Sequence, residues 1–543
     1  MPDEDKMNLG KIYHMGKEEA AELLLNRQAM ASHTFITGST GTGKSNAVYH
    51  LLDEITKNGQ TTFLVVEPAK GEYKNVFGNC TDVQVFGTNP RETPLLRMNP
   101  FAFPENIHIL EHIDRLVEIF NACWPMYAAM PAVLKDAIER SYQKVGWDLR
   151  NSESEKGVFP TFFDLLDILP GVIEESHYSK DTQSDYVGAL CTRVKSLTNG
   201  IYGSVLCAED ALTDEALFDR NVIVDLSRVG SMETKSLLMG ILVMKLQEYR
   251  MCSSGMNSRL RHVTVLEEAH NLLRKTSAEQ SQEGANLQGK SVEMLANAIA
   301  EMRTYGEGFI IADQAPGLLD MSVIRNTNTK IILRLPDEED RKLVGKSAAL
   351  KEAQIDELSK LPLGVAAVYQ NEWPEAVLCK IEAYPMPENA VYHKPSKMPH
   401  EINAEFVFGQ LAVGKELKPL SSSEMEQLKL WLKRHETVLK PEDSRYLERV
   451  FAGGELDVAK TRKAVFDFFG GISTVVDYCA AAEKSLTPRK EFLEQLQGQY
   501  GLKAAAADWV LNSVISMGMS LNPDAKAVDN LRTNFEQQGG RVL

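Results

Sequence analysis

One segment near the N-terminus combines glycines, hydroxyl side chains and a lysine in an arrangement that binds phosphate. Residues 38–45 match the pattern G-x-x-x-x-G-K-[ST] at every specified position. Glycines let the backbone curl so that successive N–H groups converge on phosphate oxygens, and a following helix adds its positive end. In this pattern Lys44 reaches the β- and γ-phosphates and Ser45 ligates Mg²⁺. The segment predicts a nucleotide site formed by Gly38, Ser39, Thr40, Gly41, Thr42, Gly43, Lys44 and Ser45.

Hydrolysis of a bound nucleotide also needs carboxylates, and two later strand-like segments end in them. Asp225 follows four apolar or near-apolar residues in NVIVDLS, whereas Glu267 and Glu268 stand side by side at the end of HVTVLEE. Hydrolysis requires one carboxylate near Mg²⁺ and a second that orients the attacking water. Only the Glu267–Glu268 pair supplies both, so we favour it over Asp225, whose more common role would be to cap a turn.

Gln314 follows the apolar run FIIAD and is polar where a packed strand would carry an apolar side chain. A polar residue at this place can sense the γ-phosphate. The alternative is a solvated strand end, and the local pattern leaves both interpretations open.

Another segment has the histidine spacing of a metal-binding motif. Residues 108–112 spell H-x-x-E-H, so that His108 and His112 would lie one helical turn apart and could share a metal ion. Because no downstream acidic ligand completes the set, we interpret the segment as a solvated helix face rather than a metal site.

The elements that position these residues are recognisable as short β-branched, apolar runs separated by helical patterns. Such alternation is typical of an α/β layer fold with a mostly parallel sheet. GVAAVY and EAVLCKI, near residues 364–381, could close one edge of the sheet in antiparallel fashion. The expected strands lie at 33–37, 61–67, 82–87, 221–227, 262–268, 308–314 and 330–335.

The density of strand patterns changes along the chain and divides it into parts. Helical periodicity, with Ile109, Ile113 and Leu116 at three- and four-residue steps, dominates after residue 103, and Pro131 stands where a helix would begin. The predicted parts are a lead-in (1–30), an α/β core (31–103 and 221–385), a helical insertion (104–220) and a helical C-terminal region (386–543).

Composition excludes several classes of protein. The 543 residues include 59 Lys and Arg against 75 Asp and Glu, a formal charge of −16, so the chain cannot coat nucleic acid with its whole surface. The 7 cysteines form no CxxC pair, which disfavours a zinc ribbon or a disulfide framework. With no signal peptide and no apolar run of membrane-spanning length, we expect a cytoplasmic protein without a membrane anchor.

Five segments carry these motifs in a fixed order: SHTFITGSTGTGKSN, VVEPAKGEYKN, LEEAHNLL, EMRTYGEGFIIADQAP and IRNTNTKIILRL. Together they resemble the HerA/FtsK branch of P-loop ATPases, and the HerA-like group most closely, over about residues 31–100 and 221–380. Two features depart from that family. Glu267 stands where many P-loop proteins have Asp, and the small β-barrel that precedes the core in many HerA proteins cannot fit into residues 1–30.

The resemblance implies a RecA-like core that uses ATP and Mg²⁺ and assembles as a hexameric ring around duplex DNA. Similar proteins translocate DNA and work with a nuclease, or with an effector in anti-phage defence. It further implies that Glu268 is the catalytic carboxylate, that Gln314 is the sensor, and that Arg303 reaches the neighbouring subunit's site. The residue pattern alone leaves Arg303 open, because a helix-end arginine could instead pair with Glu301 or Glu307.

Contact with DNA must be local in so acidic a chain. The candidate basic residues lie on loops and are Lys70, Lys74, Arg274, Lys275 and Lys290. Two functions follow as expectations: a hexameric DNA translocase that acts with a nuclease or effector, or a nucleotide-gated ring scaffold that regulates an effector without moving DNA.

Overall fold

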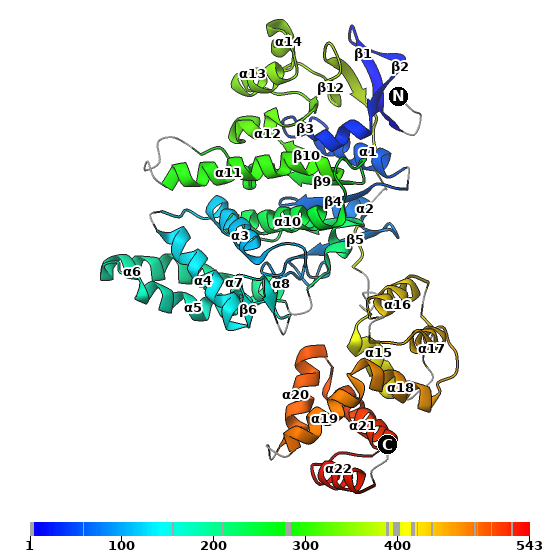
Figure 1. The fold of residues 1–543 in the computed structure, drawn as a ribbon. Coiled ribbons are helices and arrows are strands. Elements are labelled where there is room, and N and C mark those ends of the chain that lie inside the picture. The colour runs from blue at the N-terminus through cyan, green and yellow to red at the C-terminus, as the bar shows by residue number, and fades with distance from the viewer. Residues whose placement is uncertain are drawn as a thin grey trace. The chain divides into compact units, whose positions relative to one another are not determined.

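The structure, a computed structural model, describes two compact units, Met1–Lys394 and Pro395–Leu543 (Figure 1). The residues that it describes are all except 1–4, 58, 128, 155–156, 209–210, 277–283, 387–389, 395–401, 414–416, 418, 421, 436–437, 483–484, 486, 501, 523–524 and 543. Residues 277–283, between the candidate DNA-contacting residues Lys275 and Lys290, therefore lie outside the described residues.

An 11-stranded sheet organises the first unit, in the order β2-β1-β13-β12-β11-β3-β10-β9-β4-β8-β5. The seven strands from β11 to β5 run parallel to one another, which confirms the predicted α/β fold with a mostly parallel sheet. These parallel strands are β3 (Thr34–Thr37), β4 (Thr62–Glu67), β5 (Val83–Gly87), β8 (Asn221–Asp225), β9 (His262–Glu267), β10 (Glu307–Asp313) and β11 (Thr329–Ile332).

The register of the parallel strands brings polar strand ends together. Thr37 lies opposite Asp313 in the β3–β10 pair, and Ala312 lies opposite Glu267 in the β10–β9 pair. On the other side of β9, Glu67 of β4 lies opposite Asp225 of β8. Because the carboxyl ends of parallel strands share one edge, these acidic side chains line the edge at which the loop after β3 begins.

Different helices pack against the two faces of the sheet, and successive side chains along a strand point to opposite faces. Phe35 faces a core built with α3 (Ile109–Cys123), α10 (Met232–Ser253) and α11 (Gly284–Glu301). Its neighbour Ile36 faces the opposite core, which contains α1 (Lys44–Thr56) and α2 (Tyr73–Phe77). Figure 1 shows α10 and α11 alongside the central strands.

Residues 104–220 are mostly helical, as their periodicity predicts, and Pro131 lies in the first turn of α4. A small antiparallel pair, β6 (Trp147–Asp148) with β7 (Glu153–Ser154), interrupts the helices between α4 and α5. The helices after α3 are α4 (Met130–Lys144), α5 (Phe162–Glu175), α6 (Lys180–Tyr186), α7 (Thr192–Thr198), α8 (Gly200–Leu206) and α9 (Asp214–Phe218).

The antiparallel side of the sheet differs from the prediction. β12 (Val365–Gln370) and β13 (Val377–Ile381) pair antiparallel as expected, but they do not form the edge. β1 (Lys6–His14) pairs with β13, and β2 (Lys17–Asn26) forms the edge instead. The lead-in segment thus contains a hairpin that the sequence analysis missed, because most of β2 is exposed and polar and lacks an apolar run.

Short helices connect the last strands of the first unit: α12 (Met321–Arg325), α13 (Glu338–Ser347) and α14 (Glu352–Glu357). The second unit is helical and encloses its own aromatic core, which includes Phe408, Trp431 and Phe468. Its helices are α15 (Ala404–Val413), α16 (Ser422–Arg434), α17 (Pro441–Phe451), α18 (Val458–Phe468), α19 (Gly471–Ala482), α20 (Pro488–Tyr500), α21 (Ala504–Leu521) and α22 (Ala525–Gln537).

Within the described residues, no individual helix has both the length and the apolar character needed to cross a membrane. The pair α18 and α19, bent by 70° at the break between them, meets those two criteria only when taken together.

Candidate nucleotide-hydrolysis site

The glycine-rich loop lies between β3 and α1, where its backbone requires glycine at particular positions. Gly41 and Gly43 have φ angles of 76° and 104°, in the left-handed region that other residues rarely adopt. A Cβ atom at Gly38 would come within 2.7 Å of Leu333 Cβ. Thr42 Oγ1 donates to the carbonyl of Ser39 at 2.7 Å and closes the loop on itself. Since α1 begins at Lys44, its free N–H groups face the concave side of this loop.

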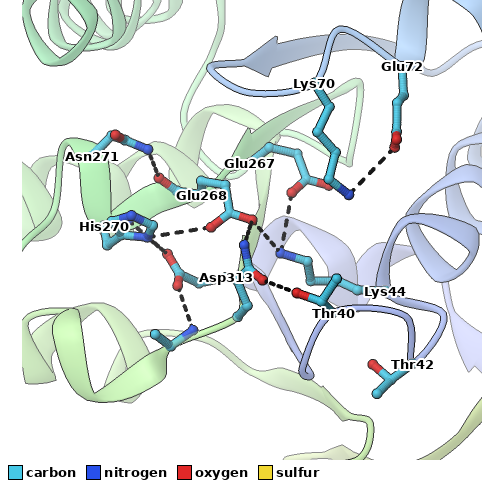
Figure 2. Close-up of polar contacts among 12 residues, drawn as sticks. Thr40, Thr42, Lys44, Lys70, Glu72, Glu267, Glu268, His270, Asn271 and Asp313 are labelled. Atoms are coloured by element: carbon cyan, nitrogen blue, oxygen red, sulfur yellow. Dashed lines mark hydrogen bonds and ion pairs between the residues drawn. The ribbon is translucent and has the colours of Figure 1, made fainter. Parts of the chain in front are cut away.

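Lys44 points from the start of α1 to the end of β9, where it meets both predicted carboxylates (Figure 2). Its Nζ lies 3.0 Å from Glu268 Oε1 and 3.6 Å from Glu267 Oε2. Burial alone would lower the pKa of Lys44, but the two carboxylates outweigh burial and raise the pKa. The structure therefore brings together the lysine and the acidic pair that are 223 and 224 positions apart in sequence.

Glu268 is held in an unusual conformation just after β9. Its φ of 45° is left-handed, which costs a non-glycine residue free energy and is common at functional sites. Oε1 accepts hydrogen bonds from Lys44 Nζ and Gln314 Nε2. Oε2 is buried and has no hydrogen-bond partner among the described residues. A buried carboxylate oxygen of this kind fits a water molecule or a Mg²⁺-bound ligand, which would supply the missing partner.

Gln314 connects the phosphate loop to Glu268. Its Nε2 donates to Glu268 Oε1 at 2.7 Å, and its Oε1 accepts from Thr40 Oγ1 at 2.8 Å. The side chain thus bridges the nucleotide loop and the acidic pair, a position that suits the sensor interpretation better than that of a solvated strand end.

Glu267 is fixed by a contact that the sequence analysis did not anticipate. Tyr73, at the start of α2, donates its hydroxyl to Glu267 Oε1 at 2.5 Å. Both residues are buried, and burial raises the pKa of Glu267 although Lys44 and Tyr73 act in the opposite direction. Ser45 lies next to Lys44 in the first turn of α1, and the sequence prediction that Ser45 and Glu267 could hold Mg²⁺ stays a prediction.

Two further residues, His270 and Asp313, order the turn that carries Glu268 (Figure 2). Asp313 Oδ2 accepts from the backbone N–H of His270 at 2.8 Å and lies 2.9 Å from His270 Nδ1. His270 Nδ1 also lies 3.6 Å from Glu268 Oε2. Ligand atoms of Glu268, His270 and Asp313 lie within 4.8 Å of one another, a spacing that a metal ion also requires. The short His270–Asp313 distance is that of a charge-assisted hydrogen bond, which accounts for the arrangement without a metal.

The His270–Asp313 contact predicts a pH-dependent stability. The hydrogen bond to Asp313 raises the pKa of His270 above 6.5, against the opposing effect of burial. The contribution of this contact to the free energy of unfolding is therefore full below about pH 6.5 and lost as the pH rises through the raised pKa. We expect His270→Gln to lower that free energy by about 2 kcal/mol in acid and by less in alkali.

Urea unfolding of His270→Gln and the parent chain, at about pH 6 and about pH 9, measures this difference. His14→Gln, at an exposed histidine at the end of β1, is the matched control and should show no such pH dependence. An equal loss of stability at both pH values would contradict the assignment.

A second charged network lies beside the first, at the ends of β4 and β8. Lys74 Nζ lies 2.6 Å from Asp225 and 3.0 Å from Glu92, and Asp225 Oδ1 accepts from the N–H of Ser227. Asp225 thus pairs with Lys74 and caps a turn. Because Lys74 is only 9% exposed and engaged by both carboxylates, its selection as a DNA-contacting residue is wrong.

Glu67 is a buried acidic residue of this region that the sequence analysis did not identify. It accepts the backbone N–H groups of Glu72 at 2.7 Å and Tyr73 at 3.1 Å, and burial raises its pKa to about 8. Glu67 ends the run TTFLVVE, so the strand-end rule that selected Asp225 and Glu267 would have found it.

The remaining basic candidates are exposed. Lys70 has a side chain 52% exposed and an ion pair with Glu72 at 3.7 Å, and Arg274, Lys275 and Lys290 are exposed on either side of residues 277–283. These four residues remain available for contact with phosphate.

Arg303 lies in the short 3-10 turn η5 (Met302–Tyr305) before β10 and is exposed. Glu307, one of its two suggested partners, is fully buried and contacts Arg250 and His262 instead. The P-loop lies at the opposite, carboxyl end of the strands. Arg303 therefore stands at the edge of the sheet away from its own nucleotide loop.

The H-x-x-E-H segment does not form a solvated helix face as predicted. His108 caps the start of α3, and His112 is fully buried with Nδ1 3.0 Å from Glu248. The histidines have separate partners, since His108 Nε2 lies 3.2 Å from the carbonyl of Arg150. Helical periodicity could not show the burial of His112, because its partner Glu248 is 136 residues away in sequence.

Comparison with known proteins supports the sequence resemblance. A family model described as the central domain of the helicase HerA matches residues 7–245. The chain is 25% identical over 393 residues to the DNA double-strand break repair helicase HerA of Sulfolobus acidocaldarius, covering 70% of this chain and 69% of the relative. It is 22% identical to the protein of the same name from Sulfurisphaera tokodaii, with 70% of each chain covered.

Among solved structures, VirB4 of Thermoanaerobacter pseudethanolicus shares the fold with a TM-score of 0.53 and 18% identity. The match covers 71% of this chain and 98% of VirB4.

Proposed function

We propose that the chain is a HerA-like P-loop ATPase that forms a ring and uses ATP and Mg²⁺ to translocate DNA. The observation that carries the proposal is the contact of Lys44 with Glu268 at 3.0 Å, because it joins the phosphate loop to a carboxylate at the end of a separate strand. The proposed ATPase core comprises residues 31–103 and 221–385, with 104–220 as a helical insertion and 386–543 as a C-terminal helical region.

In this proposal each residue of the site has a separate role in ATP hydrolysis. Loop N–H groups and Lys44 bind the phosphates, so that Lys44 exchanges carboxylates for phosphate oxygens when ATP binds. Glu268, whose Oε2 accepts no hydrogen bond among the described residues, orients the attacking water and accepts its proton. Gln314 contacts both the loop and Glu268 and reports on the γ-phosphate. Mg²⁺, held through Ser45 and Glu267, would neutralise charge on the phosphate oxygens.

The proposed ring gives Arg303 its role. β10 alone spans 7 residues, about 20 Å, between the Arg303 end and the Asp313 end beside the P-loop. Arg303 therefore cannot reach its own site, whereas a head-to-tail ring can bring it to the site of the next subunit. A cation supplied in trans stabilises the charge of the transition state.

Subunit mixing tests this role. We expect Arg303→Ala to reduce the ATP hydrolysis rate by about 10³-fold, the effect of losing such an arginine. Mixing it with Lys44→Ala, which keeps Arg303 but lacks a working loop, should recover part of the activity. Arg150→Ala, at an exposed arginine on the β6–β7 turn, serves as control and should retain activity. A mixture that stays inactive, despite forming rings by mass measurement, would contradict the trans role.

Duplex DNA is the proposed track, and a nuclease or an anti-phage effector in the cytoplasm is the proposed partner. We expect duplex DNA to stimulate ATP turnover at least several-fold through the exposed Lys70, Arg274, Lys275 and Lys290, with the stimulation falling as salt rises. Phosphate release with and without duplex DNA measures it. A rate of ATP hydrolysis that duplex DNA does not change would favour the alternative, a ring scaffold that regulates an effector without translocation.

A further inference from the structure

The hydrogen bond between Tyr73 and Glu267 joins the start of α2 to the end of β9, two places far apart in sequence. The tyrosine hydroxyl donates to Glu267 Oε1 at 2.5 Å, and the two residues are 194 positions apart. Tyr73 is 2% exposed and Glu267 is 6% exposed, so water does not compete effectively for this contact.

We propose that Tyr73 is a positioning residue for Glu267, an inference that rests on the proposed ATPase function. Tyr73 occupies Oε1, while Oε2 lies 3.6 Å from Lys44 Nζ on the P-loop side. The hydroxyl thus holds Oε1 in the protein interior and leaves Oε2 directed toward the nucleotide site. It does not touch nucleotide itself but acts through the carboxylate.

The length of the Glu267 side chain explains why such a partner is needed. A glutamate has one more rotatable bond than an aspartate, so its carboxylate must lose more conformational freedom to hold one orientation. A hydroxyl donor also favours the ionised carboxylate, which is the form that ligates a cation. Tyr73 therefore makes a glutamate suitable at a position where a shorter acid would need less restraint.

Tyr73 is itself held rigidly from two directions. Its backbone N–H donates to Glu67 Oε2 at 3.1 Å, at the end of β4. Its ring packs edge-to-face against Tyr49 of α1, with ring centroids 4.9 Å apart and an interplanar angle of 81°. Because these contacts do not involve the hydroxyl, Tyr73→Phe should leave the ring in place and remove only the bond to Glu267.

The test is Tyr73→Phe in the full chain, with Mn²⁺ as a probe of the cation site. We expect the dissociation constant of Mn²⁺ from the ADP-bound protein, measured by EPR titration, to rise about 10-fold or more. The Mg²⁺ concentration for half-maximal ATP hydrolysis should rise in parallel. The affinity for ADP without a divalent cation should not change, because Tyr73 makes no contact with the phosphate loop among the described hydrogen bonds.

Tyr142→Phe is the matched control. Tyr142 is also fully buried and donates its hydroxyl within the protein, to the carbonyl of Phe101 in the helical region. Its loss should leave Mn²⁺ binding unchanged. Thermal unfolding of both variants shows whether each remains folded.

Glu267→Asp examines the same contact from the other side. The shorter side chain withdraws from Tyr73, so adding Tyr73→Phe to Glu267→Asp should weaken Mn²⁺ binding no further. Unchanged Mn²⁺ binding in Tyr73→Phe, or an equal loss in both backgrounds, would overturn the proposal. A parent chain that binds Mn²⁺ and ADP but hydrolyses no ATP would instead refute the proposed function.

Discussion

Replacing Glu268 by glutamine is expected to reduce the rate of ATP hydrolysis by about 10²–10⁴-fold while ATP still binds, the usual effect of losing a general base. Glutamine keeps the size of the side chain and can still accept from Lys44 and Gln314 through its oxygen, but it cannot take a proton from water. Steady-state phosphate release and equilibrium binding of a fluorescent ATP analogue measure the two quantities separately.

Glu352→Gln provides the control, because Glu352 is exposed on α14 and the exchange of charge for amide is identical. It should retain both binding and hydrolysis. A Glu268→Gln chain that hydrolyses ATP at the parent rate would remove Glu268 from the mechanism and leave only a nucleotide-binding role for the site.

The second large effect is expected at Lys44. Lys44→Ala should abolish measurable ATP binding, because the phosphates lose their only lysine in the loop. It should also lower the free energy of unfolding of the nucleotide-free chain by about 3 kcal/mol, since Glu267 and Glu268 would remain side by side in a buried site without their cation.

Lys57→Ala, at the other end of α1, tests whether loss of an ordinary lysine has the same effect. The Lys57 side chain is 57% exposed and pairs with Glu54 and, at 3.3 Å, with Asp53, so its removal should change the free energy of unfolding by less than about 1 kcal/mol. Urea unfolding of the three chains gives the comparison. ATP binding by Lys44→Ala at parent affinity would contradict the assignment of the phosphate loop.

Much of the parallel sheet was predictable because its strands are buried on both faces and therefore read as continuous apolar runs. The runs ending in Glu67, Asp225 and Glu267 all proved to be strands. β2 was not predictable in this way, since it lies at the edge of the sheet and is mostly exposed. The sequence also could not show that β1 and β2 extend the sheet beyond β13, because β1 pairs with a strand far away in the sequence.

The candidate site was predictable in its residue types but not in its connections. A glycine-rich loop and an acidic pair are local patterns, so residues 38–45 and Glu267–Glu268 could be selected without a structure. The contact of Tyr73 with Glu267 spans 194 positions and depends on the order of β4 and β9 in the sheet, which no local pattern contains. The role of His270 was not predicted because its partner Asp313 lies 43 positions away in sequence, at the end of β10.

Single-turnover hydrolysis tests the central claim most directly. ATP is first bound to the purified chain without a divalent cation, Mg²⁺ is then added together with an excess of unlabelled nucleotide, and the fate of the bound ATP is followed by quenching in acid. The carboxylate that Lys44 meets at 3.0 Å predicts conversion of bound ATP to ADP in the parent chain and intact ATP in Glu268→Gln. Tightly bound ATP that leaves the parent chain unhydrolysed would contradict the account.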